Sequence, residues 1–237
     1  MEKYNDIKNR VVSVVFAVAL AILILTFSIG LPIYFRPFYY VQIDTLDMVE
    51  RTGYSYEVIK AAYDEVLNYL TLPWCEFGTG ELAWSESGAS HFADCLFLFN
   101  LNAAALIISA AIVIVVLILS KRGGISLAKP LGLNLGFWSG ASLLGVFGLL
   151  ALLVSQDFNT AFTVFHALFF PGKDNWVFNP YTDEIIKVMP QEFFMNCAIL
   201  IVSSIILISL TLIVLGIVGK AREKMTSRSD GEASPEA

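Results

Sequence analysis

Four long apolar stretches alternate with polar segments along this chain. A helix needs about 20 mostly apolar residues to cross the hydrocarbon core of a bilayer. The stretches that meet this length cover residues 11–33, 97–120, 131–154 and 193–218. The pattern predicts an all-α polytopic membrane protein with four transmembrane helices.

The polar segments between these stretches differ in their content of basic residues. Three short segments, 1–10, 121–130 and 219–237, hold ten of the 15 Lys and Arg residues. Basic residues near membrane spans favour the cytoplasmic side. We therefore expect both termini in the cytoplasm, and the Ser- and Glu-rich tail 219–237 to be disordered. Labelling from outside intact cells that reached 121–130 but not 50–70 would contradict this orientation.

The first long loop, 34–96, contains a segment with the apolar spacing of a helix. Six apolar positions recur at intervals of three and four residues, which places them on one helical face. They are Ile59, Ala62, Tyr63, Val66, Leu67 and Leu70. Ser55 precedes the segment as a candidate N-cap and Pro73 ends it. The pattern predicts an amphipathic helix over Val58–Leu70.

The second long loop, 155–192, is unusually aromatic. Phe158, Phe162, Phe165 and Phe169 form a helical stripe that begins after a possible Asp157 cap and stops at Pro171-Gly172. Further along, Trp176, Phe178 and Tyr181 are suited to the headgroup zone of a membrane. The two loops together predict a mainly helical extracytoplasmic cap.

Composition agrees with a membrane protein and removes some classes of function. Hydrophobic residues make up 57% of the chain and charged residues only 15%. The net charge of −6 argues against a nucleic-acid partner, because phosphate binding needs a basic surface. Cys75, Cys95 and Cys197 form no C-x-x-C motif, which disfavours a disulfide framework or a thiolate zinc site.

Gly132, Gly136 and Gly140 fall at the four-residue spacing of one face of the third span, which predicts close helix packing there.

The chain has only two histidines, and both lie next to predicted spans. If a helix begins near residue 89, His91 shares a face with Asp94 and Cys95. Asp94 is then placed to fix the orientation and tautomer of His91, as a third group does in catalytic triads. His166 lies on the aromatic stripe at a similar predicted depth. Interface anchoring of both rings, or a metal site of two histidines and one aspartate, are the alternatives.

The segments around these histidines resemble the lipoprotein intramolecular transacylase family of low-GC Gram-positive bacteria. The matching pieces are R-x-F-Y (Arg36, Phe38, Tyr39), S-G-x-x-H-F-x-D (Ser87, Gly88, His91, Phe92, Asp94), and a longer block (Asp157, Phe158, Phe162, Phe165, His166, Phe169, Phe170, Gly172, Trp176, Pro180, Pro190, Glu192, Phe193, Phe194). The family usually has an aliphatic residue where Cys95 stands. The resemblance covers essentially the whole chain except the tail.

The resemblance implies intramolecular acyl transfer. The substrate would be a lipoprotein with an S-diacylglyceryl cysteine and a free α-amine, which receives one acyl chain to give the lyso form. It implies His91 and His166 as catalytic residues at the outer leaflet of the bacterial cell membrane, and the helical spacing described above adds Asp94 in support. Arg36 is a candidate to stabilise an oxyanion or bind a carbonyl, or else a boundary residue that reaches the headgroups. No cofactor or metal is implied, and the expected partners are the lipoprotein and membrane lipid.

Two other functions remain open at this point. A non-enzymatic four-span scaffold of claudin-like layout would need a β-rich first loop, and a metal-binding membrane protein would need a complete ligand set. A bond between Cys75 and Cys95 is compatible with an oxidising exterior, but the spacing does not establish it.

Overall fold

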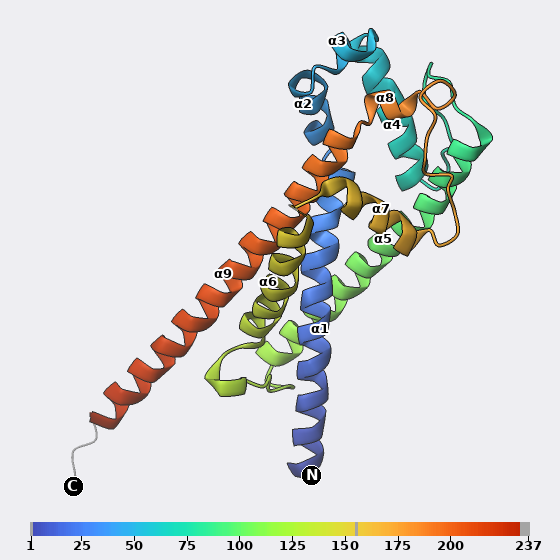
Figure 1. The fold of residues 1–237 in the computed structure, drawn as a ribbon. Helices are drawn as coiled ribbons and strands as arrows, with labels where there is room; N and C mark the ends of the chain where they lie inside the picture. The colour runs from blue at the N-terminus through green and yellow to red at the C-terminus, as the bar shows by residue number, and fades with distance from the viewer. Residues whose placement is uncertain (1, 155, 233–237) are drawn as a thin grey trace. The chain divides into compact units, whose positions relative to one another are not determined.

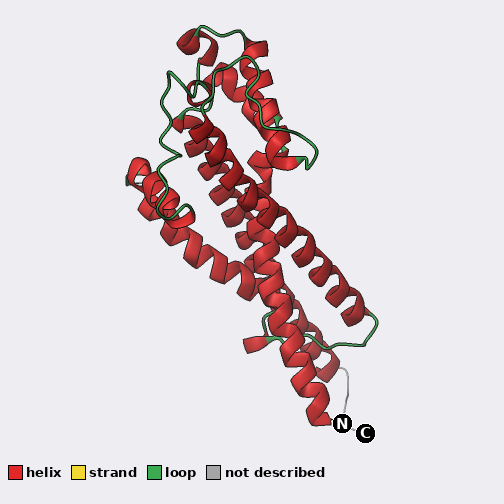
Figure 2. Cartoon of the chain, turned by 90° about the vertical axis from the view of Figure 1, so that its right-hand side faces the viewer, coloured by secondary structure: helices red, strands yellow, loops and turns green. Residues whose placement is uncertain are grey.

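The structure, a computed structural model, describes residues 2–154 and 156–232, and all regular elements in these ranges are helical (Figures 1 and 2). Four helices are long and apolar enough to cross a membrane, which confirms the predicted fold class. They are α1 (Glu2–Tyr34), α5 (Glu86–Lys121), α6 (Leu135–Val154) and α9 (Gln191–Glu232). The shorter elements are α2 (Pro37–Thr45), α3 (Met48–Thr52), α4 (Tyr56–Thr71), the 3-10 turn η1 (Pro130–Gly132), α7 (Phe158–Phe169) and α8 (Ile185–Val188).

The chain divides into two compact units, each with its own apolar core. The first comprises residues 1–26, 105–150 and 203–237, and its core includes Phe16, Ala19 and Val113. The second comprises residues 27–104 and 151–202. It contains both histidines and all of the short α-helices.

Helix α4 organises the core of the second unit. Its six buried residues are the six apolar positions predicted from the sequence, and Ser55 caps it by accepting a hydrogen bond from the Val58 amide. The ring of Tyr63 stacks on Tyr39 with centroids 3.6 Å apart. The Tyr39 hydroxyl donates to the Val188 carbonyl at 2.6 Å, which ties α2 to α8. The helical prediction for this loop is confirmed, and a β-rich first loop is wrong.

The third apolar helix begins later than predicted. Asn134 accepts from the Phe137 amide at 2.9 Å, so α6 starts at Leu135 rather than at 131. Gly132 lies in the preceding turn with a φ of 72°, so only Gly136 and Gly140 share the helical face. At Gly140 a Cβ atom would lie 2.8 Å from the Ser209 carbonyl oxygen, so this glycine permits the close approach of α6 and α9.

The C-terminal segment also differs from its prediction. Helix α9 continues to Glu232, whereas disorder was predicted from 219 onward. Residues 220–230 contain no glycine or proline, and Lys, Arg, Glu and Met are good helix formers, which accounts for the continuation. Residues 233–237 lie outside the described part of the chain, and the orientation across the membrane stays a prediction.

Candidate active site

The two histidines lie on different helices of the second unit and face each other. Helix α5 has 36 residues and is about 54 Å long, whereas the hydrocarbon core is about 30 Å thick. Part of α5 must therefore lie outside the hydrocarbon core, and the predicted spans place the polar first turns, which contain His91, in that part. Helix α7 supplies His166, and the two ring centroids are 5.8 Å apart. The predicted convergence is present in the structure, with both residues over 90% buried.

Both histidines line a cavity of about 330 Å³. Its walls are almost entirely apolar and come from α1, α4, α5, α7, α8, α9 and the segment after α7. Leu67, Phe99, Phe162 and Phe193 are among the lining residues, as are Cys95 and Cys197. An apolar pocket with a few polar groups is the usual form of a site for a small-molecule ligand.

Aromatic rings enclose the histidine pair. Trp176 stacks on His166 with centroids 4.4 Å apart, and Phe162 contacts the same ring at 4.3 Å. Phe170 and Phe178 pack edge-on against His91 at 4.9 and 5.5 Å. The sequence suggested the headgroup zone for Trp176 and Phe178; the structure packs both around the histidines, while Tyr181 is exposed.

This enclosure disfavours the charged form of each ring. Burial, assisted by the neighbouring His166, lowers the pKa of His91 to about 4. Burial also lowers the pKa of His166, although its bond to a backbone carbonyl opposes the shift. Both rings are therefore neutral at pH 7 and able to accept a proton.

The tautomer of His166 follows from its backbone contact. Its Nδ1 atom lies 2.7 Å from the carbonyl oxygen of Phe162, one turn earlier on α7. A carbonyl oxygen only accepts, so the neutral ring must carry its proton on Nδ1. Its Nε2 atom is left with a free lone pair, as a general base requires.

Asp94 does not bind the His91 ring as predicted. Its carboxylate forms an ion pair with Lys173 and accepts from Asn175 Nδ2 at 3.0 Å. The bond from Lys173 contributes most, and the bond from Asn175 adds to it, in holding the pKa of Asp94 below its usual value. Asp94 thus attaches the segment after α7 to the turn of α5 that contains His91. The Cys95 Sγ atom lies 3.4 Å from His91 Nε2, as the predicted shared face allows.

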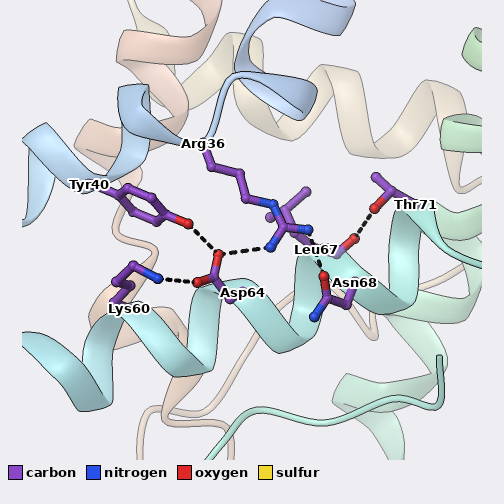
Figure 3. Close-up of polar contacts among 7 residues, drawn as sticks. All are labelled: Arg36, Tyr40, Lys60, Asp64, Leu67, Asn68 and Thr71. Carbon is purple, nitrogen blue, oxygen red and sulfur yellow. Dashed lines mark hydrogen bonds and ion pairs between the residues drawn. The ribbon is translucent and has the colours of Figure 1, made fainter.

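Arg36 belongs to a separate polar network in the same unit (Figure 3). Its guanidinium binds Asp64 Oδ1 at 3.0 Å and Asn68 Oδ1 at 2.7 Å, both on α4. Asp64 also accepts from Tyr40 at 2.7 Å and from Lys60 at 2.6 Å. Arg36 is not among the residues that line the cavity. These contacts join the α1–α2 junction to α4, and both roles suggested for Arg36 by the sequence stay predictions.

Within the described ranges, no group of three or more His, Cys, Asp or Glu side chains is arranged to hold a metal ion. The metal-binding alternative therefore gains no support from the geometry. Cys75, Cys95 and Cys197 are free thiols, so Cys75 and Cys95 are not bonded.

Comparison with known proteins decides the family. The model of the lipoprotein intramolecular transacylase family, Lit, matches residues 14–194. The chain belongs to the Lit family. No curated protein matches the chain. Lit-family membership makes the protein a membrane acyltransferase by class and gives no support to the claudin-like alternative.

Solved structures show the same fold. The in meso structure of membrane-integral Lit from Bacillus cereus has a TM-score of 0.80 at 24% identity and covers 92% of this chain and 98% of that one. Two variants of that protein, with a histidine replaced by arginine or alanine, each have a TM-score of 0.75, at 23% and 22% identity. They cover 95% and 94% of this chain and 97% and 98% of theirs.

Sequence reasoning missed Lys173 and Asn175. They lie in a loop, with no periodicity to mark them, and their partner Asp94 is about 80 residues away in the chain. A polar K-D-N run between aromatic residues was the one visible signal.

Proposed function

We propose that this Lit-family protein transfers one acyl chain within a lipoprotein. The chain moves from the glycerol ester of an S-diacylglyceryl cysteine to the α-amine of the same cysteine. The product is the N-acyl, S-monoacylglyceryl lyso form. The observation that supports this most strongly is a pair of neutral, buried histidines in contact with one apolar cavity.

The proton balance of this reaction suits such a pair. The amine nitrogen attacks the ester carbonyl carbon and loses a proton, and the glycerol oxygen leaves and gains one. His166 Nε2 is the proposed proton acceptor, because its Nδ1 is committed to Phe162. The protonated ring then returns the proton to the glycerol oxygen. The C–O ester bond breaks, the C–N amide bond forms, and no net proton is taken up.

The remaining features supply position rather than further chemistry. The amine and the ester belong to one molecule, so holding them at attack distance replaces a bimolecular encounter. The apolar walls suit the acyl chain and exclude water, which would otherwise compete with the amine for the ester. Conversion of an ester to an amide is downhill and needs no activated donor.

A purified-protein assay tests the reaction directly. The full-length protein in bilayers is mixed with a synthetic diacylglyceryl lipopeptide, and the product is sequenced by tandem mass spectrometry. We expect an unchanged total mass with one acyl chain moved to the terminal nitrogen. The same lipopeptide with an acetylated α-amine is the matched control and should not react. Release of free fatty acid from both substrates would identify a hydrolase and end the proposal.

A further inference from the structure

The loop after α7 lies against the turn of α5 that contains His91. Asn175 Nδ2 is within 3.0 Å of Asp94 Oδ2 and 3.4 Å of Ser90 Oγ. Ser90 and Asp94 are one turn apart on α5, and His91 lies between them in the sequence. The Asn175 amide is therefore positioned against the turn of α5 that contains His91.

Asp94 determines which way this amide points. A carboxylate oxygen only accepts, so the NH₂ group of Asn175 must face Asp94 and its Oδ1 atom must face away. Because Asp94 also pairs with Lys173, its charge is fixed in place. The alternative amide orientation would put two acceptor oxygens together, which is unfavourable.

Two buried polar atoms near this contact lack a hydrogen-bond partner. Among the described residues, His91 Nδ1 and Asn175 Oδ1 are both buried without a hydrogen-bond partner by strict geometry. Buried polar atoms without partners are costly, and such atoms in a native protein call for an explanation. A side-chain contact with Asn175 also acts to raise the pKa of His91, against the effect of burial.

We propose that Asp94 sets the tautomer of His91 indirectly, by orienting Asn175 so that its Oδ1 atom accepts the Nδ1 proton of His91. The Nε2 atom of His91 then carries the lone pair, which faces the weak thiol donor of Cys95, and both residues line the cavity. Both histidines would thus bind their Nδ1 proton to a protein oxygen, His166 through a backbone carbonyl and His91 through a side-chain amide.

Asn175 is in this view a positioning residue, and its role in the rate rests on the proposed function. The tautomer itself can be measured without any turnover. The protein is purified from cells given histidine labelled with ¹⁵N at Nδ1, and the presence of a bonded proton is detected by NMR. Only two signals exist, and a His166→Gln variant assigns them.

We expect a proton on His91 Nδ1 in the wild type and loss of this preference in Asn175→Leu, which keeps the side-chain shape without the oxygen. Asp94→Asn should weaken the preference to a smaller extent. The acyl-transfer rate of Asn175→Leu should fall about 10- to 100-fold, less than the ~10⁴ lost when the charged orienting residue of a serine protease is neutralised. Asn179→Ala is the control, because this exposed residue of the same loop contacts neither histidine.

The outcomes separate the two proposals. An unprotonated His91 Nδ1 in the wild type, or an unchanged tautomer in Asn175→Leu, would overturn the role of Asn175. A tautomer that shifts as expected would support that role even if no lyso-form product were found, and the missing product would count against the proposed function alone.

Discussion

The second unit contains two polar clusters that differ in how completely their hydrogen bonds are formed. In the Arg36 network, both oxygens of Asp64 are bonded, and the guanidinium binds two acceptors on α4 (Figure 3). Around the histidines, polar atoms are few, buried and partly unpaired among the described residues. In a network whose donors and acceptors are all bonded, no polar atom remains to bind a ligand. Buried polar atoms without partners can still bind a substrate or exchange a proton with it. We therefore expect the first cluster to serve the architecture of the unit and the second to serve the proposed reaction.

The largest effect should come from the histidines. We expect His91→Ala and His166→Ala each to reduce lyso-form production by about 10²–10⁴-fold, the usual contribution of general acid–base catalysis. If the rings act as one unit, the double variant should be little worse than either single one. Mass spectrometry of a reporter lipoprotein, with protein levels measured by immunoblot, tests this. A wild-type amount of lyso-form product from either single variant would mean that the replaced histidine is an interface anchor and not a catalytic residue.

The pH profile should show a smaller but diagnostic effect. Because its pKa is lowered to about 4, His91 keeps the neutral, proton-accepting form as the pH falls from 7 to 5.5, and the lowered pKa of His166 acts in the same direction. An α-amine, with a pKa of about 7.7–8.0, becomes protonated in this range. We expect kcat/KM of the purified enzyme to fall about tenfold per pH unit, from the amine alone. A fall approaching a hundredfold per unit would mean that a histidine titrates there too.

The smallest effect on chemistry should come from the Arg36 network. Arg36→Ala removes one of the three partners of Asp64 and the bond to Asn68 Oδ1, and should lower the free energy of unfolding by about 1–3 kcal/mol, as for hydrogen bonds to charged groups. Activity per folded molecule should stay within about twofold, measured after thermal-shift analysis of the same sample.

Arg51→Ala is the matched control for that substitution. Its ion pair with Glu192 is about half exposed and should contribute only about 0–1 kcal/mol. A large loss of activity in folded Arg36→Ala protein, with none in Arg51→Ala, would indicate that Arg36 takes part directly in the reaction.

The elements were easier to predict than the contacts between them. Helix α4 has six apolar positions at helical spacing, and α7 has both an aromatic stripe and an Asp157 cap, which accepts from the Thr160 amide as predicted. Such patterns are local, so the sequence displays them. The boundary of α6 was less visible, because it depends on the side-chain cap of Asn134.

Long-range polar pairing had no such signal. Asp64 lies on the polar face of α4, where the sequence suggests solvent, yet it binds Arg36 from a different segment. Asn175 reaches Asp94 only because the loop after α7 folds back onto α5. The histidines were found because they are rare, and their neighbours were missed because Lys and Asn are common in loops.

The aromatic enclosure has a consequence for ligand design. Surroundings that keep two imidazole rings uncharged also oppose the entry of any other cation, including the ammonium form of an amine. Mimics that replace the reacting amine with a fixed positive charge should therefore make weak inhibitors. Neutral, uncleavable analogues that carry an N–H or O–H donor on an acyl tail match both the apolar cavity and its two proton acceptors.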